Sequence, residues 1–423
     1  MINPIEKKIL ESCDAIFPRV VDFTKDMVKQ YGVLNQEEGV LDVVERQMKD
    51  LNLPVHHVPI DEKRLGKHPL FAPVEWGYDK KYNLVSPINP GADGKTLVLN
   101  GHLDVVDATP FGMWSRPPNE PWEKDGWLYG RGAGDMQSGV AAMIYAVHAL
   151  DHAGVDITSP LTIQAVVEEE CTGNGALACL ERGYDGDFVL IPEPFGPQIY
   201  AGQVGVLWFK LAIEGTPVHV LDTSVGDNAI RKLQLLIPFL QDLEDELNEK
   251  YRTPPYDQFD HPFNLNIGKF SGGNWASSVP SYAEMEARIG FPPGMAASEI
   301  MQMVSDCVEG ATRKLAAFAD KKPKLRFHGF RSEGHLVDLK DDGIKLLSHC
   351  HHALTNTEPE RFYATCTTDL RAFHFYNKTA GTCYGPVAQR IHGVDECVDI
   401  ESIRQTLRTY ALFISRWCSI RPR

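Results

Sequence analysis

The chain carries five side chains suited to binding a pair of metal ions, and each borders a strand-like apolar run. They are three carboxylates and two imidazoles: Asp135, Glu170, Glu193, His102 and His392. Such oxygen and nitrogen donors suit zinc-like ions, and two ions can share one bridging carboxylate. A pair of ions can polarise a carbonyl group and supply hydroxide at neutral pH, so the set predicts a hydrolase.

Two further acidic side chains lie beside these ligands. Residues i and i+2 of a strand share a face, so Asp104 can orient the imidazole of His102. Glu169 and Glu170 would point apart, which leaves one to bind metal and the other to handle protons. The triplet Glu168–Glu170 directly follows an apolar run, as expected at the carboxyl edge of an open α/β sheet. A charged strand end without function is the alternative interpretation.

Strand and helix patterns alternate through the first half of the chain. Helical spacing over residues 5–50 is followed by a loop at 63–83. Strands are predicted at 96–100, 161–167 and 188–191, with a small-residue helix at 138–150. This alternation predicts an α/β domain with a mixed, largely parallel sheet flanked by helices.

The pattern changes near residue 205. A strand at 206–213 precedes one long helix at 228–251, strands at 263–267 and 283–289, a helix at 297–318 and a strand at 324–330. This is the split-βαβ order of a small α+β domain. The α/β pattern returns at 343–352 and 381–384. We therefore expect one domain built from residues 1–204 and 330–423, interrupted by a second at 205–329.

The composition limits which binding partners and which cellular compartment we expect for the chain. A net charge of -15 argues against nucleic acid or an anionic membrane surface as partner. Nine scattered cysteines without a C-x-x-C pair fit a reducing environment. The N-terminus lacks a signal-peptide pattern and no apolar run is long enough to span a bilayer, so we expect a cytoplasmic location.

Five motifs in order give the chain a resemblance that runs nearly end to end. They are Gly101–Val106, Gly130–Met136, Glu168–Gly175, Pro192–Pro194 and His392–Glu396. On these motifs the chain resembles the co-catalytic di-zinc hydrolases that include aminoacylases, acetylornithine deacetylases, succinyl-diaminopimelate desuccinylases and glutamate carboxypeptidases.

The resemblance implies a role for each metal-site residue. Asp135 would bridge two divalent ions, zinc or else cobalt or manganese. His102 and Glu193 would complete one ion site, and Glu170 and His392 the other. Glu169 would be the general base, and Asp104 the partner that orients His102.

The resemblance also implies a lid and dimerisation role for residues 205–329. His219, in the segment Gly215–His219, matches a lid histidine that reaches the active site of the neighbouring subunit. Arg288 matches a lid arginine that binds a substrate carboxylate. A homodimer or higher homo-oligomer acting on a small carboxylate-bearing substrate is therefore expected.

Two departures from the family pattern leave the substrate open. Gln137 stands where many members have lysine, and Ser277 where many have asparagine. The favoured reaction is hydrolysis of the amide C–N bond of a small N-acylated amino acid, by a metal-bridged hydroxide with Glu169 as base. The alternatives are hydrolytic deamination of a carboxylated ring, dipeptidase or carboxypeptidase activity, and an inactive binding or scaffold protein.

Overall fold

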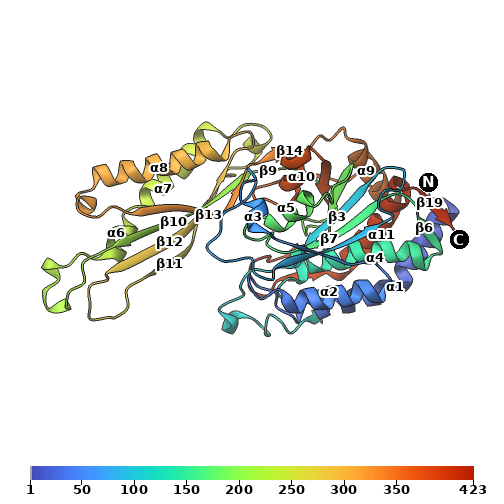
Figure 1. Cartoon of the computed structure of the whole chain (residues 1–423), viewed down its shortest axis with the longest axis horizontal. Coiled ribbons are helices and arrows are strands. Elements are labelled where there is room, and N and C mark those ends of the chain that lie inside the picture. Colours follow the sequence, from blue (N-terminus) through green and yellow to red (C-terminus); the bar gives the residue numbers. More distant parts are fainter. Residues whose placement is uncertain (1) are drawn as a thin grey trace.

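The computed structural model describes residues 2–423, which form a larger α/β part and a smaller inserted α+β unit (Figure 1). The larger part is built on a six-stranded sheet in the order β1-β2-β7-β3-β8-β16. Its pairs β3–β7, β3–β8 and β8–β16 are parallel, and the two pairs at the β1 edge are antiparallel. The predicted mixed, largely parallel sheet is confirmed. Its strands are β1 (His56–Pro59), β2 (Tyr82–Ile88), β3 (Leu97–His102), β7 (Leu161–Val166), β8 (Phe188–Ile191) and β16 (Ala380–Cys383).

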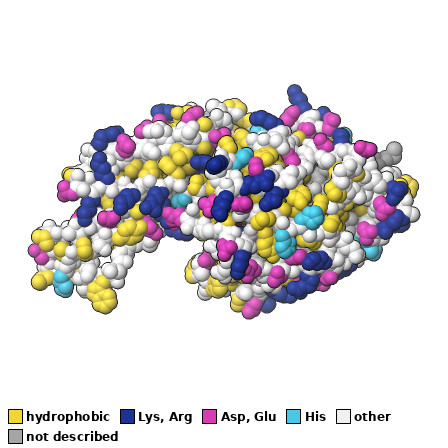
Figure 2. Space-filling view, in the orientation of Figure 1, with side chains coloured by type: hydrophobic (Ala, Val, Ile, Leu, Met, Phe, Trp, Pro, Cys, Tyr) yellow, Lys and Arg dark blue, Asp and Glu magenta, His cyan; other side chains and the backbone are white. Residues whose placement is uncertain are grey.

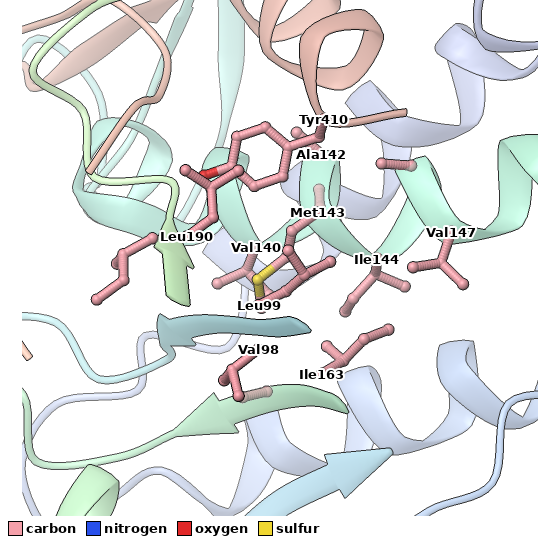
Figure 3. Close-up of a cluster of buried hydrophobic side chains, with 14 of the residues drawn as sticks. Val98, Leu99, Val140, Ala142, Met143, Ile144, Val147, Ile163, Leu190 and Tyr410 are labelled. Atoms are coloured by element: carbon pink, nitrogen blue, oxygen red, sulfur yellow. The ribbon is translucent and has the colours of Figure 1, made fainter. Parts of the chain in front are cut away.

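Helix α4 (Ser138–His152) covers one face of this sheet against β3 and β7, and α1 (Pro4–Val28) and α11 (Ile400–Trp417) pack on α4. Gly139 lets α4 approach closely, because a Cβ there would collide with the carbonyl of Pro192. Figure 3 shows Leu99 of β3 beneath Met143 of α4, and both side chains are fully buried. Burying one such side chain contributes about 1.5–3 kcal/mol, so this layer fixes the strands that carry the site. The other helices are α2 (Glu38–Asp50), α3 (Glu62–Leu65), α5 (Asn174–Glu181), α9 (Asp342–Thr355) and α10 (Leu370–Asn377).

The inserted unit is a four-stranded antiparallel sheet in the order β11-β12-β10-β13. The predicted strand–helix–strand–strand–helix–strand order is confirmed, but the prediction of a single helix at 228–251 is wrong. That segment splits into α6 and α7, because Pro238 lacks the N–H that would continue the helical hydrogen bonds. The elements are β10 (Gly205–Glu214), α6 (Ala229–Gln234), α7 (Ile237–Lys250), β11 (Leu265–Gly272), β12 (Tyr282–Phe291), α8 (Ala297–Lys314) and β13 (Lys324–Ser332).

The two faces of the inserted sheet have different surroundings. Leu207, Phe209 and Leu211 of β10 lie in a hydrophobic core of their own, together with residues of α7 and α8. The alternate residue Trp208 lines a cavity of about 530 Å³ between the inserted unit and the larger part. The sheet therefore presents one face to its own helices, while the other face contributes residues such as Trp208 to this cavity. The domain boundaries at 205 and 329 stay a prediction, and β13 itself ends at Ser332.

Three small sheets complete the larger part: β14-β9-β15, β17-β18-β5-β4 and β19-β6. No helix within residues 2–423 combines the length and the apolar character needed to cross a membrane. The strands are β4 (Trp122–Lys124), β5 (Trp127–Tyr129), β6 (Val155–Ile157), β9 (Ile199–Gln203), β14 (His335–Leu336), β15 (Arg361–Ala364), β17 (Ala388–Gln389), β18 (Cys397–Asp399) and β19 (Ile420–Pro422).

Candidate metal centre

Three of the predicted ligands lie where neighbouring parallel strands end. His102 is the last residue of β3, while Glu170 and Glu193 follow β7 and β8. Because the carboxyl ends of parallel strands meet at one edge of a sheet, these side chains converge. Asp135 lies in the turn Ala133–Gln137 that leads into α4, and His392 lies in the loop between β17 and β18.

The Asp135 carboxylate stands between the two imidazoles. Its Oδ1 is 3.2 Å from Nε2 of His102, and its Oδ2 is 3.4 Å from Nε2 of His392. Nε2 of His392 is also 3.1 Å from Oε1 of Glu170. Ligand atoms of His102, Asp135 and Glu170 all lie within 4.8 Å of one another. The two Asp135 oxygens thus face different histidines, as a carboxylate shared by two ions would require.

Crowded charges shift the pKa values of these groups. Burial alone would raise the pKa of Asp135, but hydrogen bonds from His102 and His392 outweigh it and hold that pKa below its usual range. The negative charge of Glu170 raises the pKa of His392 to about 11. Burial, with His102 opposing and Asp135 adding to it, leaves the pKa of Glu193 well above its ordinary value.

The chemistry of this cluster fits divalent cations. Glu193 and Glu169 are 4% and 6% exposed, and each lies close enough to other carboxylates for their charges to raise its pKa. Oε1 of Glu169 has no hydrogen-bond partner in the described part of the chain. Buried carboxylates are costly unless they are paired or coordinate metal. Hard oxygen donors with two imidazole nitrogens therefore suit ions of the zinc type.

Asp104 acts differently from the expectation that its side chain orients His102. The closer partner of Nδ1 of His102 is the backbone carbonyl of Asp104, at 2.9 Å, while the Asp104 carboxylate is 3.9 Å away. That carboxylate accepts the backbone N–H groups of Glu169 and Glu170 at 3.2 and 3.1 Å. Strand alternation places Asp104 beside His102 but does not distinguish a side-chain contact from a backbone contact.

Glu396 is a site residue whose role the motif alone did not indicate. Its fully buried carboxylate accepts the backbone N–H groups of Gly132, Gly134 and Asp135, each at 3.0 Å, and pairs with Arg131. It therefore holds the turn that presents Asp135. The only signal in the sequence was its place at the end of the His392–Glu396 motif.

The sequence patterns also gave no indication of Arg371 and Asp369. Both are buried beside Glu169, the candidate general base. Nη1 of Arg371 is 3.8 Å from Oε1 of Glu169, and the same guanidinium donates to the carbonyls of Thr368 and Thr172 at 2.7 and 2.8 Å. The neighbouring Gly173 has a φ of +74°, and a Cβ there would collide with Arg371. Neither carboxylate oxygen of Asp369 has a hydrogen-bond partner within residues 2–423.

Arg288 and His219 both lie in the inserted unit, in different surroundings. Arg288, on β12, lines the cavity that Glu169, Glu170 and His392 also line. It donates to the carbonyls of Asn264 and Thr365 at 3.3 and 3.0 Å. His219 is exposed in the loop after β10, where its Nδ1 accepts the N–H of Leu221. It does not line this cavity, so its role in the site stays a prediction.

Comparisons with known proteins find relatives in sequence and in fold. A relative from Bacillus subtilis, named N-formyl-4-amino-5-aminomethyl-2-methylpyrimidine deformylase, is 26% identical over 78% of this chain and 80% of its own. The dipeptidase Dug1p of Saccharomyces cerevisiae superposes with a TM-score of 0.83 at 14% identity, over 99% of both chains. Human carnosine dipeptidase 1 superposes with a TM-score of 0.79 at 16% identity, over 97% of this chain and 98% of its own.

The family model described as peptidase family M20/M25/M40 matches residues 98–416. This match spans all five predicted ligands, and the resemblance to metal-dependent C–N hydrolases is confirmed. The chain belongs to peptidase family M20/M25/M40 and is a metal-binding hydrolase of that family.

Proposed function

We propose that the chain hydrolyses the amide bond of a small N-acylated compound that carries a carboxylate, an N-acylated amino acid above all. The observation that carries this proposal is the cavity of about 530 Å³ with the metal-site residues Glu170 and His392 and the cation Arg288 in its walls. A scissile amide near the ligands and a carboxylate near Arg288 fit this arrangement. The relative named as a deformylase of an N-formylated compound supports an N-acyl amide as the reacting group.

Two divalent ions, zinc or else cobalt or manganese, would be held by His102 and Glu193, by Glu170 and His392, and by Asp135 between them. Such ions polarise a carbonyl group and lower the pKa of water toward neutrality. Glu169 lies beside these ligands, with Oε2 at 4.0 Å from Nε2 of His102 and Oε1 without a hydrogen-bond partner in the described chain. In this proposal Glu169 takes the proton of the attacking water and delivers it to the leaving amine.

Dipeptide hydrolysis is the second candidate, and similarity in fold to two dipeptidases over nearly the whole chain favours it. Deamination of a carboxylated ring would use the same atoms. A screen of metal-reconstituted protein against N-formyl and N-acetyl amino acids, dipeptides and aromatic amino-carboxylates separates the three. Release of a carboxylic acid supports the proposal, while release of two amino acids or of ammonia supports an alternative. The proposal would be wrong if metal-loaded protein hydrolysed none of these compounds.

We further propose that residues 205–329 form a lid and dimerisation domain, with 1–204 and 330–423 as the catalytic domain. Exposed apolar side chains near His219 support a protein interface, since Leu221 is 90% and Trp275 73% exposed. Figure 2 shows hydrophobic side chains at this end of the molecule. In a symmetric dimer, His219 would act in the partner's active site.

Mixed dimers of two inactive variants, His219→Ala and Glu169→Ala, test this role of His219. One site of a mixed dimer would combine both intact residues, and random exchange makes half of the dimers mixed. Activity should therefore recover to about a quarter of wild type. Demonstrated subunit exchange without recovery would place His219 in its own subunit or outside catalysis.

We also propose a cytoplasmic location, because all nine cysteines are free and most are buried. Cell fractionation that places the protein outside the cytoplasm would contradict this.

A further inference from the structure

The segment Pro69–Lys81, which we name the strap, lies between α3 and β2 and contains neither helix nor strand. It contacts the inserted unit on one side and the turn Glu168–Gly173 on the other. It forms hydrogen bonds and ion pairs with both.

Toward the inserted unit, the strap is bound to β13 and β10. The carbonyl of Pro73 accepts the N–H of Gly329 at 2.8 Å, and the carbonyl of Phe71 accepts from Arg331 at 3.1 Å. Glu75 forms an ion pair with Lys210 at 2.8 Å. These bonds attach the strap to the strands at the β13 side of the inserted sheet.

Toward the metal centre, the strap surrounds the carboxylate of Glu168, which is fully buried. This carboxylate accepts from Nε1 of Trp76 at 2.7 Å, from the hydroxyl of Tyr78 at 2.9 Å and from Nζ of Lys81 at 2.7 Å. Ala72 exchanges two further hydrogen bonds with the side chain of Asn174, at 3.0 and 2.8 Å. Hydrogen bonds to a buried charge are among the stronger ones in proteins, so the strap and the turn should move as one body.

Glu168 is therefore not a spare general base, because its carboxylate is occupied by these three strap donors and by the hydroxyl of Thr172 at 3.0 Å. It directly precedes Glu169 and Glu170, and its φ of +70° sets the direction in which the chain leaves β7. We propose that the strap couples the position of the inserted unit to the geometry of Glu169 and Glu170, with Glu168, Trp76 and Tyr78 as positioning residues. This inference rests on the proposed role of Glu169 as general base.

The inner end of the strap is tested by Tyr78→Phe and Trp76→Phe. Each removes one hydrogen bond to Glu168 and keeps an aromatic ring, so folding is less endangered than by Glu168→Gln. We expect kcat to fall about tenfold for each, because Glu169 should leave its active position more often when Glu168 is held by one hydrogen bond fewer. KM should stay within about twofold and the metal content should not change, because neither residue touches substrate or metal. A change confined to KM or to metal content would overturn the positioning role.

The outer end is tested by hydrogen exchange, which needs no substrate. The backbone amides of Glu169 and Glu170 bond to Asp104, so their exchange reports how firmly the turn is held. Lys210→Met removes the ion pairs of Lys210 with Glu75 and with Glu286, whereas Glu75→Gln leaves the second pair intact. Both variants should speed exchange in a peptide covering residues 168–173. Lys324→Met is the control, because Lys324 pairs with Glu214 at 2.8 Å on the same sheet, away from the strap.

Coupling also predicts that Lys210→Met lowers kcat in the wild-type background but adds little once Tyr78→Phe is present.

Equal hydrogen exchange in Lys210→Met and Lys324→Met would overturn the coupling. If Lys210→Met alone speeds exchange but the wild type hydrolyses no amide, the proposed function fails while the coupling stands. If the wild type is active and exchange is unaffected, only the coupling fails.

Discussion

Two glutamates of equal exposure have opposite surroundings in this molecule. Glu6, near the start of α1, and Glu169, at the metal centre, are each 6% exposed. Glu6 accepts from Arg416 at 2.8 Å and from the N–H of Asn3 at 2.8 Å, and these bonds outweigh burial and lower its pKa. Burial and neighbouring carboxylates raise the pKa of Glu169 well above its ordinary value, against the charge of His102. A buried carboxylate that is hydrogen-bonded within the chain stabilises the fold. Glu169 has its cations only at 3.8 Å (Arg371) and 4.0 Å (His102), so its carboxylate is available for chemistry.

Among these carboxylates, a substitution at the metal centre should cost the most, and Asp135 should show the largest loss of activity. Asp135→Ala removes the carboxylate that faces both imidazoles, so we expect loss of both metal ions and of all measurable activity. Elemental analysis of purified protein measures the ions directly. A variant that keeps one tightly bound ion, or a fully active wild type that holds only one, would show that Asp135 is not a bridge.

Glu169→Gln keeps the shape of the side chain and removes its charge. Metal content and fold should be retained, while kcat falls by ~10²–10⁴-fold, the range for loss of a general base. Glu6→Gln is the matched control at equal burial and should keep full activity. Near wild-type turnover by Glu169→Gln would remove Glu169 from the chemistry.

The two imidazoles of the metal centre also differ in exposure and in the support that each receives. The His102 side chain is 1% exposed and held by the Asp104 carbonyl, whereas the His392 side chain is 53% exposed. A held imidazole binds metal ~10–100-fold more tightly than one without such support. A chelator titration should therefore remove ions in two steps, and His392→Ala should lose mainly the more weakly held ion. Simultaneous loss of both ions from wild type would contradict this asymmetry.

A modest effect is expected from Glu6→Gln on stability. Loss of a hydrogen-bonded charge should lower the free energy of unfolding by about 1.5–3 kcal/mol at pH 7. Because the pKa of Glu6 is lower in the folded chain than its ordinary 4.5, its contribution is fully present above pH 4.5 and is lost as the pH falls below the folded value. Urea unfolding at several pH values should show wild type and variant converging in acid. A difference that persists unchanged in acid would assign the effect to packing.

The sequence indicated the sheet and the metal ligands because apolar strand patterns end directly in polar residues. His102, Glu170 and Glu193 each follow such a run, and strands that pair in parallel must bring these ends together. The supports of the site could not be predicted in the same way. Glu396 binds the Asp135 turn, and Arg371 binds Thr172, across separations of more than 190 residues that no local pattern encodes.

The site tolerates few substitutions at Gly173. Gly183 shares its positive φ, at +86°, but a Cβ placed there would meet no described atom within 4 Å, whereas any side chain at Gly173 would meet Arg371. Asparagine tolerates such backbone angles better than most residues. In a saturation scan we therefore expect Gly183→Asn to survive selection and Gly173→Asn to be depleted. Two glycines that share a positive φ would thus have opposite mutational profiles, decided by an arginine almost 200 positions away.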